Sequence, residues 1–293
     1  MIDIALQIVG ILAPSFLLAF IGLVWFYKGP DFPVPFVTTL VMNLALPALL
    51  FHTLTNTTVA ITALGTVAMA TLVLHIIFAG VAFALLKIAG KDWRLSISHI
   101  VGNTGNLGLP VCFLAFGDEG LAYAIAFFSV QCFLLFSIGE GIIAGTPSVK
   151  RMLQSPILHA VWLGVLCRVF TVEMPAVVDQ TLELLGQTVI PIMLITLGFS
   201  LASMRAAQLS ATVFWSGVRT LVALVIGFGV ARLFGLDGVA GGVVILQTVM
   251  PVAVFNYLLA AKYGRDSSEV SGMILVTHLA AIIYLPLILF YVL

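Results

Sequence analysis

The chain has 293 residues, of which 62% are hydrophobic and only 8% are charged. A soluble domain carries about 25% charged residues, so this composition excludes a soluble globular protein, and it excludes a disordered chain because too much apolar surface would remain in water. Twelve basic residues balance twelve acidic ones, which leaves no positive field for a nucleic-acid partner. The three cysteines lie in apolar runs without metal-ligand spacing, and we expect neither a bound metal nor a cofactor.

Apolar runs long enough to cross a bilayer follow one another along the whole chain. Short loops join these runs and leave no room for a soluble domain, so the sequence predicts an all-α polytopic membrane protein. Read between glycines, prolines and charged residues, the predicted spans are 4–27, 34–54, 62–89, 95–116, 120–144, 152–170, 178–201, 211–234, 238–261 and 270–292.

Basic residues gather on one side of this predicted arrangement, and only Arg168 and Arg232 lie on the other. We expect Arg219, early in the eighth span, to reach the same basic side by snorkelling rather than to bind a ligand. The positive-inside rule then predicts a multi-pass protein of the cell membrane, inner or plasma, with both termini extracellular or periplasmic. The residues on the cytoplasmic side are Lys28, Lys87, Lys91, Arg94, Lys150, Arg151, Arg205, Arg219, Lys262 and Arg265.

Amides, prolines and glycines recur between the two halves of the chain. Five helices in each half is an odd number, so the second half must enter the membrane from the opposite face, as in many secondary transporters. The sequence predicts two inverted repeats, 1–144 and 156–293, joined by a short cytoplasmic linker, 145–155. The alternative is chance, since prolines and glycines are common in membrane helices. The pairs are Asn43 and Pro47 with Gln187 and Pro191, Pro14 and Gly22 with Pro156 and Gly164, and Pro110 with Pro251.

The fourth span contains a stretch, 102–110, with three glycines, two asparagines and a proline. Such a stretch disfavours an unbroken helix, and irregular backbone at membrane depth must face protein or a watery cavity. We expect Pro110 at the first position of a restarted half-helix, and Pro251 to play the same part in the ninth span. Two half-helix N-termini would then meet near the midplane and offer N–H groups to a carboxylate. A simple kink at each proline is the alternative.

Other polar residues within the spans have two interpretations. Gln131, Asn256 and His278 could line a cavity or form hydrogen bonds between helices. We expect His75 to be a core histidine with its hydrogen bonds satisfied. Glu140 and Glu183 lie near span ends and can reach the interface, although an intramembrane acid is a functional candidate by default.

Three motifs, Asn43 to Phe51, Gly102 to Pro110 and Gln247 to Asn256, resemble the auxin efflux carrier family of membrane transporters. The resemblance covers the whole chain. It implies ten helices with the fourth and ninth broken and crossed, as in sodium/bile-acid symporters and sodium/proton antiporters. It also implies a scaffold of spans 1, 2, 6 and 7, a mobile transport domain of the remaining spans, and a homodimer through the scaffold helices. The short linker differs from the long central loop of plant auxin carriers, which favours a prokaryotic-type carrier and argues against auxin as the substrate.

The favoured function is a secondary carrier that moves a small organic anion across a lipid membrane by alternating access. A sodium- or proton-coupled transporter of the same fold is the alternative, disfavoured because no carboxylate lies beside either predicted break. A channel is a weaker alternative, and an intramembrane enzyme lacks any hydrolase or metalloprotease motif. The candidate substrate-binding residues are Asn43, Asn103, Asn106, Pro110, Gln131, Gln247, Thr248, Pro251, Asn256 and His278.

Overall fold

The computed structural model describes residues 2–144, 153–204 and 209–293, and its regular elements are all helical within these ranges. Most of the predicted linker, 145–152, and Arg205 lie outside the described residues. The helices are α1 (Ile2–Lys28), α2 (Val34–Leu40), η1 (Val41–Ala45), α3 (Leu46–Asn56), α4 (Ile61–Ile88), η2 (Trp93–Leu95), α5 (Ser96–Ile100), η3 (Thr104–Gly108), α6 (Leu109–Leu134), η4 (Leu135–Gly139), α7 (Glu140–Ala144), α9 (Pro156–Val169), α10 (Ala176–Gln187), α11 (Val189–Ser203), α12 (Leu209–Leu233), α13 (Gly238–Val249), α14 (Val254–Lys262) and α15 (Ser267–Val292).

Seven helical stretches in the described ranges are long and apolar enough to cross a membrane. Two further apolar helices, α9 and α13, are shorter. The prediction of an all-helical polytopic membrane protein is therefore confirmed at this level. The seven stretches are Asp3–Lys28, Val34–Asn56, Ile61–Ile88, Thr104–Ala144, Ala176–Ser203, Ala211–Leu233 and Ser267–Val292.

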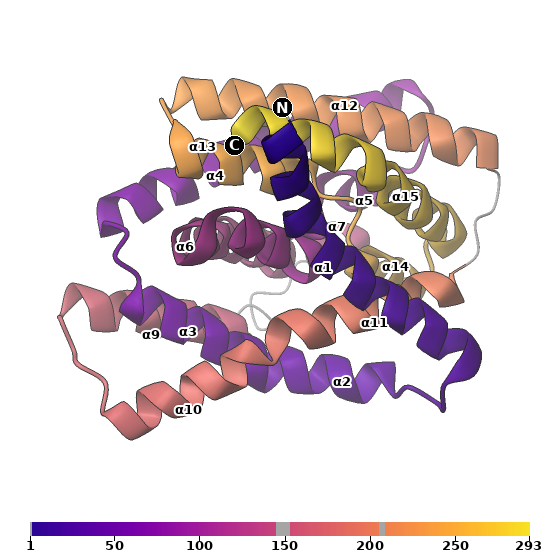
Figure 1. Ribbon diagram of the computed structural model, residues 1–293. Coiled ribbons are helices and arrows are strands. Elements are labelled where there is room, and N and C mark those ends of the chain that lie inside the picture. The colour runs from indigo at the N-terminus through magenta and orange to yellow at the C-terminus, as the bar shows by residue number, and fades with distance from the viewer. Residues whose placement is uncertain (1, 145–152, 205–208) are drawn as a thin grey trace.

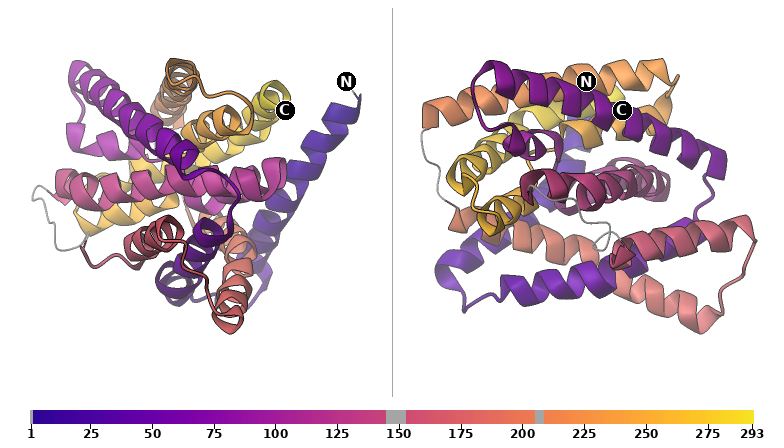
Figure 2. Two further views of the ribbon diagram at one scale, coloured as in Figure 1. Left: turned by 90° about the vertical axis from the view of Figure 1, so that its left-hand side faces the viewer. Right: turned by 180° about the vertical axis from the view of Figure 1, so that it is seen from behind.

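The helices pack in two groups that share one apolar core. In the first group α1 lies along α11, and α3 lies against α9 and α10. In the second group α12 contacts α4, α13 and α15, and α6 contacts α4 and α13. Figure 1 shows α3, α9 and α10 along the bottom of the molecule, α12 along the top and α6 between them, and both views in Figure 2 keep this order.

Two glycines let α1 and α11 approach until their backbones touch. A Cβ atom on Gly22 would lie 1.9 Å from the carbonyl oxygen of Ile195, and one on Gly198 would lie 1.7 Å from that of Ala19. Both distances are far below van der Waals contact, so only glycine fits at either position. Without a hydrophobic drive between helices in lipid, such close packing of small residues supplies much of the attraction.

We expect Gly22→Ala to lower the melting temperature of the purified protein in detergent by several degrees, because the added methyl group must push α11 away from α1. Overpacking of this kind costs about 1–3 kcal/mol. Gly10→Ala in the same helix is the matched control, since no atom lies within 4 Å of its Cβ position. If the two variants melted alike, the close approach of α1 and α11 would be contradicted.

The widened helical turns η1 and η3 each end two residues before a proline, Pro47 and Pro110 respectively. A proline lacks the N–H group and its ring crowds the carbonyl four residues earlier, which here belongs to Asn43 or Asn106. A turn with one extra residue relieves this clash without ending the helix. The recurring spacing of asparagine and proline therefore produces a local widening rather than a break.

Gly117 interrupts the long stretch Thr104–Ala144. An unbroken helix of this length would extend about 60 Å, twice the thickness of a bilayer core. Gly117 has φ of 65°, a left-handed conformation that glycine adopts at little cost. The chain changes direction at this residue, between the predicted fourth and fifth spans.

Ion pairs connect the ends of α7, α14 and α15 and the turn before η2. The carboxylate of Glu140 is buried, and it also accepts a hydrogen bond from Tyr263 Oη at 2.6 Å. Glu140 therefore takes part in this network, whereas Glu183 is exposed and accepts from Gln187 Nε2 at 3.2 Å. The ion pairs are Lys91–Glu269 at 2.5 Å, Lys262–Glu140 at 3.1 Å and Arg265–Asp92 at 3.9 Å.

Candidate functional site: the crossing of two helix breaks

Two non-helical segments meet inside the second group of helices. The first, 101–103, separates α5 from η3, and the second, 250–253, separates α13 from α14. α5 lies beside α14, and α6 lies beside α13, so two interrupted helices cross at their interruptions. We refer to segments 101–103 and 250–253 together as the crossing.

The two segments pair through their backbones as a short antiparallel bridge between Gly102 and Val252. The N–H of Asn103 donates to the carbonyl of Pro251 at 2.6 Å, and the N–H of Ala253 donates to the carbonyl of Val101 at 3.1 Å. Backbone that has left a helix at membrane depth thus finds partners within the protein, as burial there requires.

Side chains from α15 and α6 hold the first segment in place. His278 Nδ1 lies 2.8 Å from the carbonyl of Ile274, which can only accept, so Nε2 of the neutral ring accepts from Asn103 Nδ2 at 3.0 Å. Gln131 Nε2 donates to the carbonyl of Gly102 at 3.1 Å and to Thr104 Oγ1 at 2.6 Å. Asn103, Gln131 and His278 are all buried. The three predicted residues therefore form one hydrogen-bonded shell around the first segment.

A side chain from α14 binds the first segment, and a side chain from α15 binds the second. Asn256 Nδ2 donates to the carbonyl of Val101 at 3.0 Å, and the N–H of Val252 donates to Thr277 Oγ1 at 3.1 Å. Asn256 is fully buried, as is Thr277, which the sequence analysis did not select. The only sequence feature that pointed to Thr277 was its position next to His278.

Several polar atoms near the crossing have no hydrogen-bond partner among the described residues. They include both side-chain polar atoms of Gln247 and the Oδ1 atom of Asn256, all buried. A Cβ atom on Gly108 would lie 2.1 Å from Gln247 Oε1, which places this amide against the first turns after the break. Because buried polar groups are normally paired, these atoms make the crossing a candidate binding site.

A family described as "Membrane transport protein" matches residues 34–150 and 144–289 of this chain. The chain belongs to this family. It is the auxin efflux carrier-like family that the three motifs resemble, so the resemblance is confirmed. Its members are transporters, which also confirms that this protein is not an enzyme.

Three relatives are transporters by name. An "Uncharacterized transporter" of Methanothermobacter thermautotrophicus is 29% identical over 206 residues, 68% of each chain. An "Uncharacterized transporter" of Methanocaldococcus jannaschii is 26% identical over 67% of this chain and 68% of its own. A "Putative malonate transporter" of Rhizobium meliloti is 22% identical over 300 residues, covering 94% of this chain and 93% of its own.

The remaining candidate residues of this transporter lie in different settings. Asn106, on η3, is half-buried, and no hydrogen bond of its side chain is recorded among the described residues. Thr248 donates to the carbonyl of Val244 in its own helix at 2.6 Å and packs against Gly227 of α12. Asn43 is exposed on η1, which packs against α9, α10 and α11, so the structure does not bring it together with the other candidates.

The expected position of the half-helix starts was wrong for both prolines. The helix after the first break restarts at Thr104, six residues before Pro110, and the helix after the second break starts at Val254, three residues after Pro251. Pro110 lies inside a continuous helix because the wide turn η3 accommodates it. Pro251 lies within the second segment, and its carbonyl pairs with Asn103.

The expectation for Arg219 was also wrong. Its side chain is 1% exposed, the largest of the fully buried side chains in the described ranges. It lies ten residues from the start of α12, about 15 Å along the helix, which is beyond the reach of a snorkelling side chain. The sequence signal was present, because an ionisable residue inside a span is a functional candidate by default.

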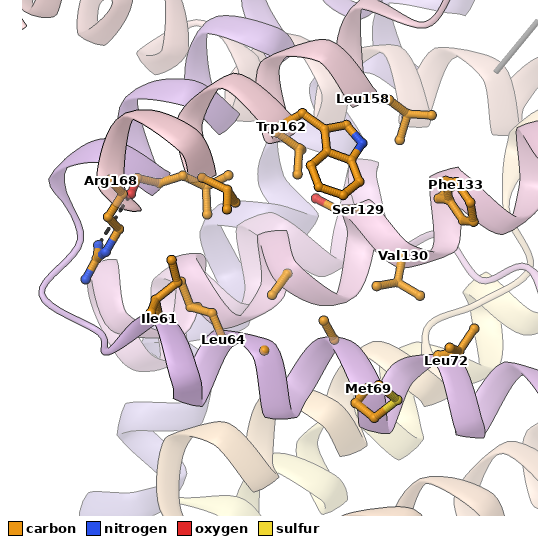
Figure 3. A pocket seen from close by; sticks show the side chains of 16 residues that line it. Ile61, Leu64, Met69, Leu72, Ser129, Val130, Phe133, Leu158, Trp162 and Arg168 are labelled. Carbon is orange, nitrogen blue, oxygen red and sulfur yellow. Dashed lines mark hydrogen bonds between the residues drawn. The ribbon is translucent and has the colours of Figure 1, made fainter. Parts of the chain in front are cut away.

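A groove of about 420 Å³ lies between α4, α6 and α9, away from the crossing (Figure 3). Leu64, Met69, Phe133 and Trp162 line it, and none of the ten candidate residues does. Arg168 lies at one end, but its guanidinium donates to backbone carbonyls of residues 54, 57 and 59. An apolar groove with its only cation already engaged does not suit a carboxylate, so the crossing is the better candidate.

Proposed function

We propose that this protein is a secondary transporter that moves a small organic anion across the membrane by alternating access, with the anion bound at the crossing. The observation that carries the proposal is the buried meeting of two helix breaks, beside which the amide of Gln247 and the Oδ1 atom of Asn256 have no hydrogen-bond partner among the described residues. η3 and α14 both begin there, and helix N-termini offer free N–H groups and partial positive charge to an anion. The relative described as a malonate transporter fits such a substrate.

We propose further that the chain makes ten crossings of the membrane as two inverted repeats, 1–144 and 156–293. The packing of the paired glycines supports this. Gly22 of α1 meets α11, and a Cβ on Gly164 of α9 would lie 3.1 Å from Leu54 of α3. α1 corresponds to α9 in the repeat, and α11 corresponds to α3, so the two contacts are equivalent.

In this proposal the first group of helices, with α2 and η1, is the scaffold, and the second group, with the crossing, is the transport domain. The turn η3, which carries the half-buried Asn106, lies where the two groups meet, since it contacts both α11 and α6. A shift of one group along the other would expose this place first to one side of the membrane and then to the other.

The proposed orientation follows from the basic residues. The turns 29–33 and 263–266 lie at one end of the molecule in Figure 1, and the turns 57–60, 170–175 and 234–237 lie at the opposite end. Lys28, Lys262 and Arg265 belong to the first end. We propose that this end is cytoplasmic, that both termini are extracellular or periplasmic, and that the protein resides in the cell membrane. A homodimer through the scaffold helices is part of the proposal and rests on the family resemblance; native mass spectrometry in mild detergent should show it.

Substrate counterflow tests the proposed function. Proteoliposomes loaded with an unlabelled carboxylate should take up the same labelled carboxylate from outside at low concentration, because a carrier exchanges substrate one molecule at a time. Malonate, succinate, acetate and pyruvate form the first panel. A channel would give no counterflow, and the absence of counterflow for every carboxylate tested would contradict the proposal.

Coupling to a proton is the second candidate, and the contacts of one buried histidine bear on it. His75 Nδ1 lies 2.8 Å from the carbonyl of Thr71, and Nε2 lies 3.4 Å from Gln131 Oε1. Both neighbours are acceptors, and only a protonated ring donates to both at once. Counterflow and net uptake measured across a pH series, and with sodium replaced by potassium, separate proton coupling, sodium coupling and uncoupled exchange.

A further inference from the structure

The buried guanidinium of Arg219 belongs to the inward face of α12. Residues 212, 216, 219 and 223 repeat at helical spacing and are all buried, whereas Leu221 and Val225 on the other face are exposed. The charge is therefore directed into the second group of helices and not toward lipid. α12 contacts α13 and α15, which flank the crossing.

Arg219 has only part of its hydrogen-bonding capacity used. Nε donates to the carbonyl of His99 at 3.2 Å, at the end of α5. Nη1 and Nη2 are buried and have no partner among the described residues. All twelve acidic residues lie in the described ranges, and none of them pairs with this guanidinium. Burying a charge without a partner costs free energy, so we expect an anion that the protein binds to pair with this guanidinium.

The guanidinium adjoins the crossing. A Cβ atom on Gly102 would lie 3.1 Å from Arg219 Nη2 and 3.1 Å from the carbonyl oxygen of Met250. The absence of a side chain at Gly102 therefore leaves Arg219 next to both non-helical segments. Further buried atoms without partners lie on the neighbouring residues: Ser98 Oγ, His99 Nε2, Ser216 Oγ and Asn256 Oδ1.

We propose that Arg219 is the fixed positive charge that recognises the carboxylate of the transported anion, with Nη1 and Nη2 as a two-point donor. This inference rests on the proposed function and specifies the substrate class. One carboxylate of the anion binds to the arginine, and the rest of the anion contacts neutral amide and hydroxyl groups of the protein. The planar guanidinium fits a carboxylate through two parallel hydrogen bonds, which a lysine cannot reproduce.

A purely structural role makes a different prediction. If Arg219 only capped the carbonyl of His99, its removal would lower stability and leave affinity for the anion unchanged. If the charge is paired only when the anion is bound, Arg219→Met should leave the melting temperature of the unliganded protein unchanged or raise it. The substitution replaces an unpaired buried charge with an apolar side chain of similar length.

The test measures melting temperature and affinity for a carboxylate that the wild type exchanges in counterflow. We expect Arg219→Met to weaken binding roughly 30-fold or more and to remove the ligand-induced thermal shift, with Arg219→Lys intermediate. Arg232→Met is the matched control, since Arg232 is exposed in the last turn of the same helix, and it should leave affinity unchanged.

Unchanged affinity in Arg219→Met or in Arg219→Lys would overturn the inference while the proposed function stands. A wild type that exchanges no carboxylate would contradict the proposed function instead. A second measurement needs no variant: the neutral amide of the exchanged acid should compete at least tenfold more weakly than the acid, because it lacks the charge. An amide that competes as well as the acid would also overturn the inference.

Discussion

Asn106→Leu should abolish counterflow while leaving expression and melting temperature close to those of the wild type. The side chain of Asn106 is half-buried, and no hydrogen bond of its amide is recorded within the described part of the chain, so the folded state loses no known contact with it. Its position on η3, a few residues after the first break, suits a contact with substrate. One hydrogen bond to a charged group is worth about 1.5–3 kcal/mol, so binding should weaken tenfold to a hundredfold.

Asn103→Leu is the informative comparison. Asn103 is buried and bonded to His278, and leucine would leave His278 Nε2 without its donor. An unsatisfied buried group costs about 1–3 kcal/mol, so this variant should lose both stability and transport. Wild-type counterflow in Asn106→Leu would show that the substrate does not touch η3. A large loss of stability in that variant would show a structural role instead.

Much of the fold could be predicted from the composition and two short motifs. Apolar runs separated by glycines, prolines and charged residues are sufficient to identify membrane helices, because backbone groups in lipid must form hydrogen bonds within their own helix. Glycine and asparagine in Gly102 to Asn106 indicated a break within a few residues of its actual position, and Gln247 to Pro251 did the same for the second break. Both are local effects of residues that disfavour a helix.

The positions that sequence reasoning missed depend on packing. The helix restart could not be placed from Pro110 alone, because a wide turn can absorb a proline and keep the helix intact. The burial of Arg219 depends on which face of α12 meets α13 and α15, which no local pattern determines. Asn43 and Asn106 have the same spacing to a proline, yet only Asn106 lies within a few residues of the crossing, since the two helices that carry them pack in different groups.

Pro110→Ala should weaken anion binding although it removes no side chain that we place in contact with substrate. Alanine restores the N–H donor and removes the ring that crowds the carbonyl of Asn106, so the reason for the wide turn η3 disappears. Residues 104–108 can then wind into an ordinary α-helix. When the wide turn becomes an ordinary turn with one residue fewer in it, the preceding residues rotate about the helix axis by about 100°, because an α-helix has 3.6 residues per turn. Asn106 would no longer face its present direction.

Stability should hold or rise in the same variant, because the helix gains a backbone hydrogen bond. Pro47→Ala is a close control: Pro47 follows η1 at the spacing at which Pro110 follows η3, but it lies in the first group of helices. It should change stability in a similar way and leave affinity unchanged. Melting temperature and carboxylate affinity measured for both variants separate the two roles. Equal affinities in wild type and Pro110→Ala would mean that η3 is only a packing feature, and the main physical reason for placing the anion beside Asn106 would be lost.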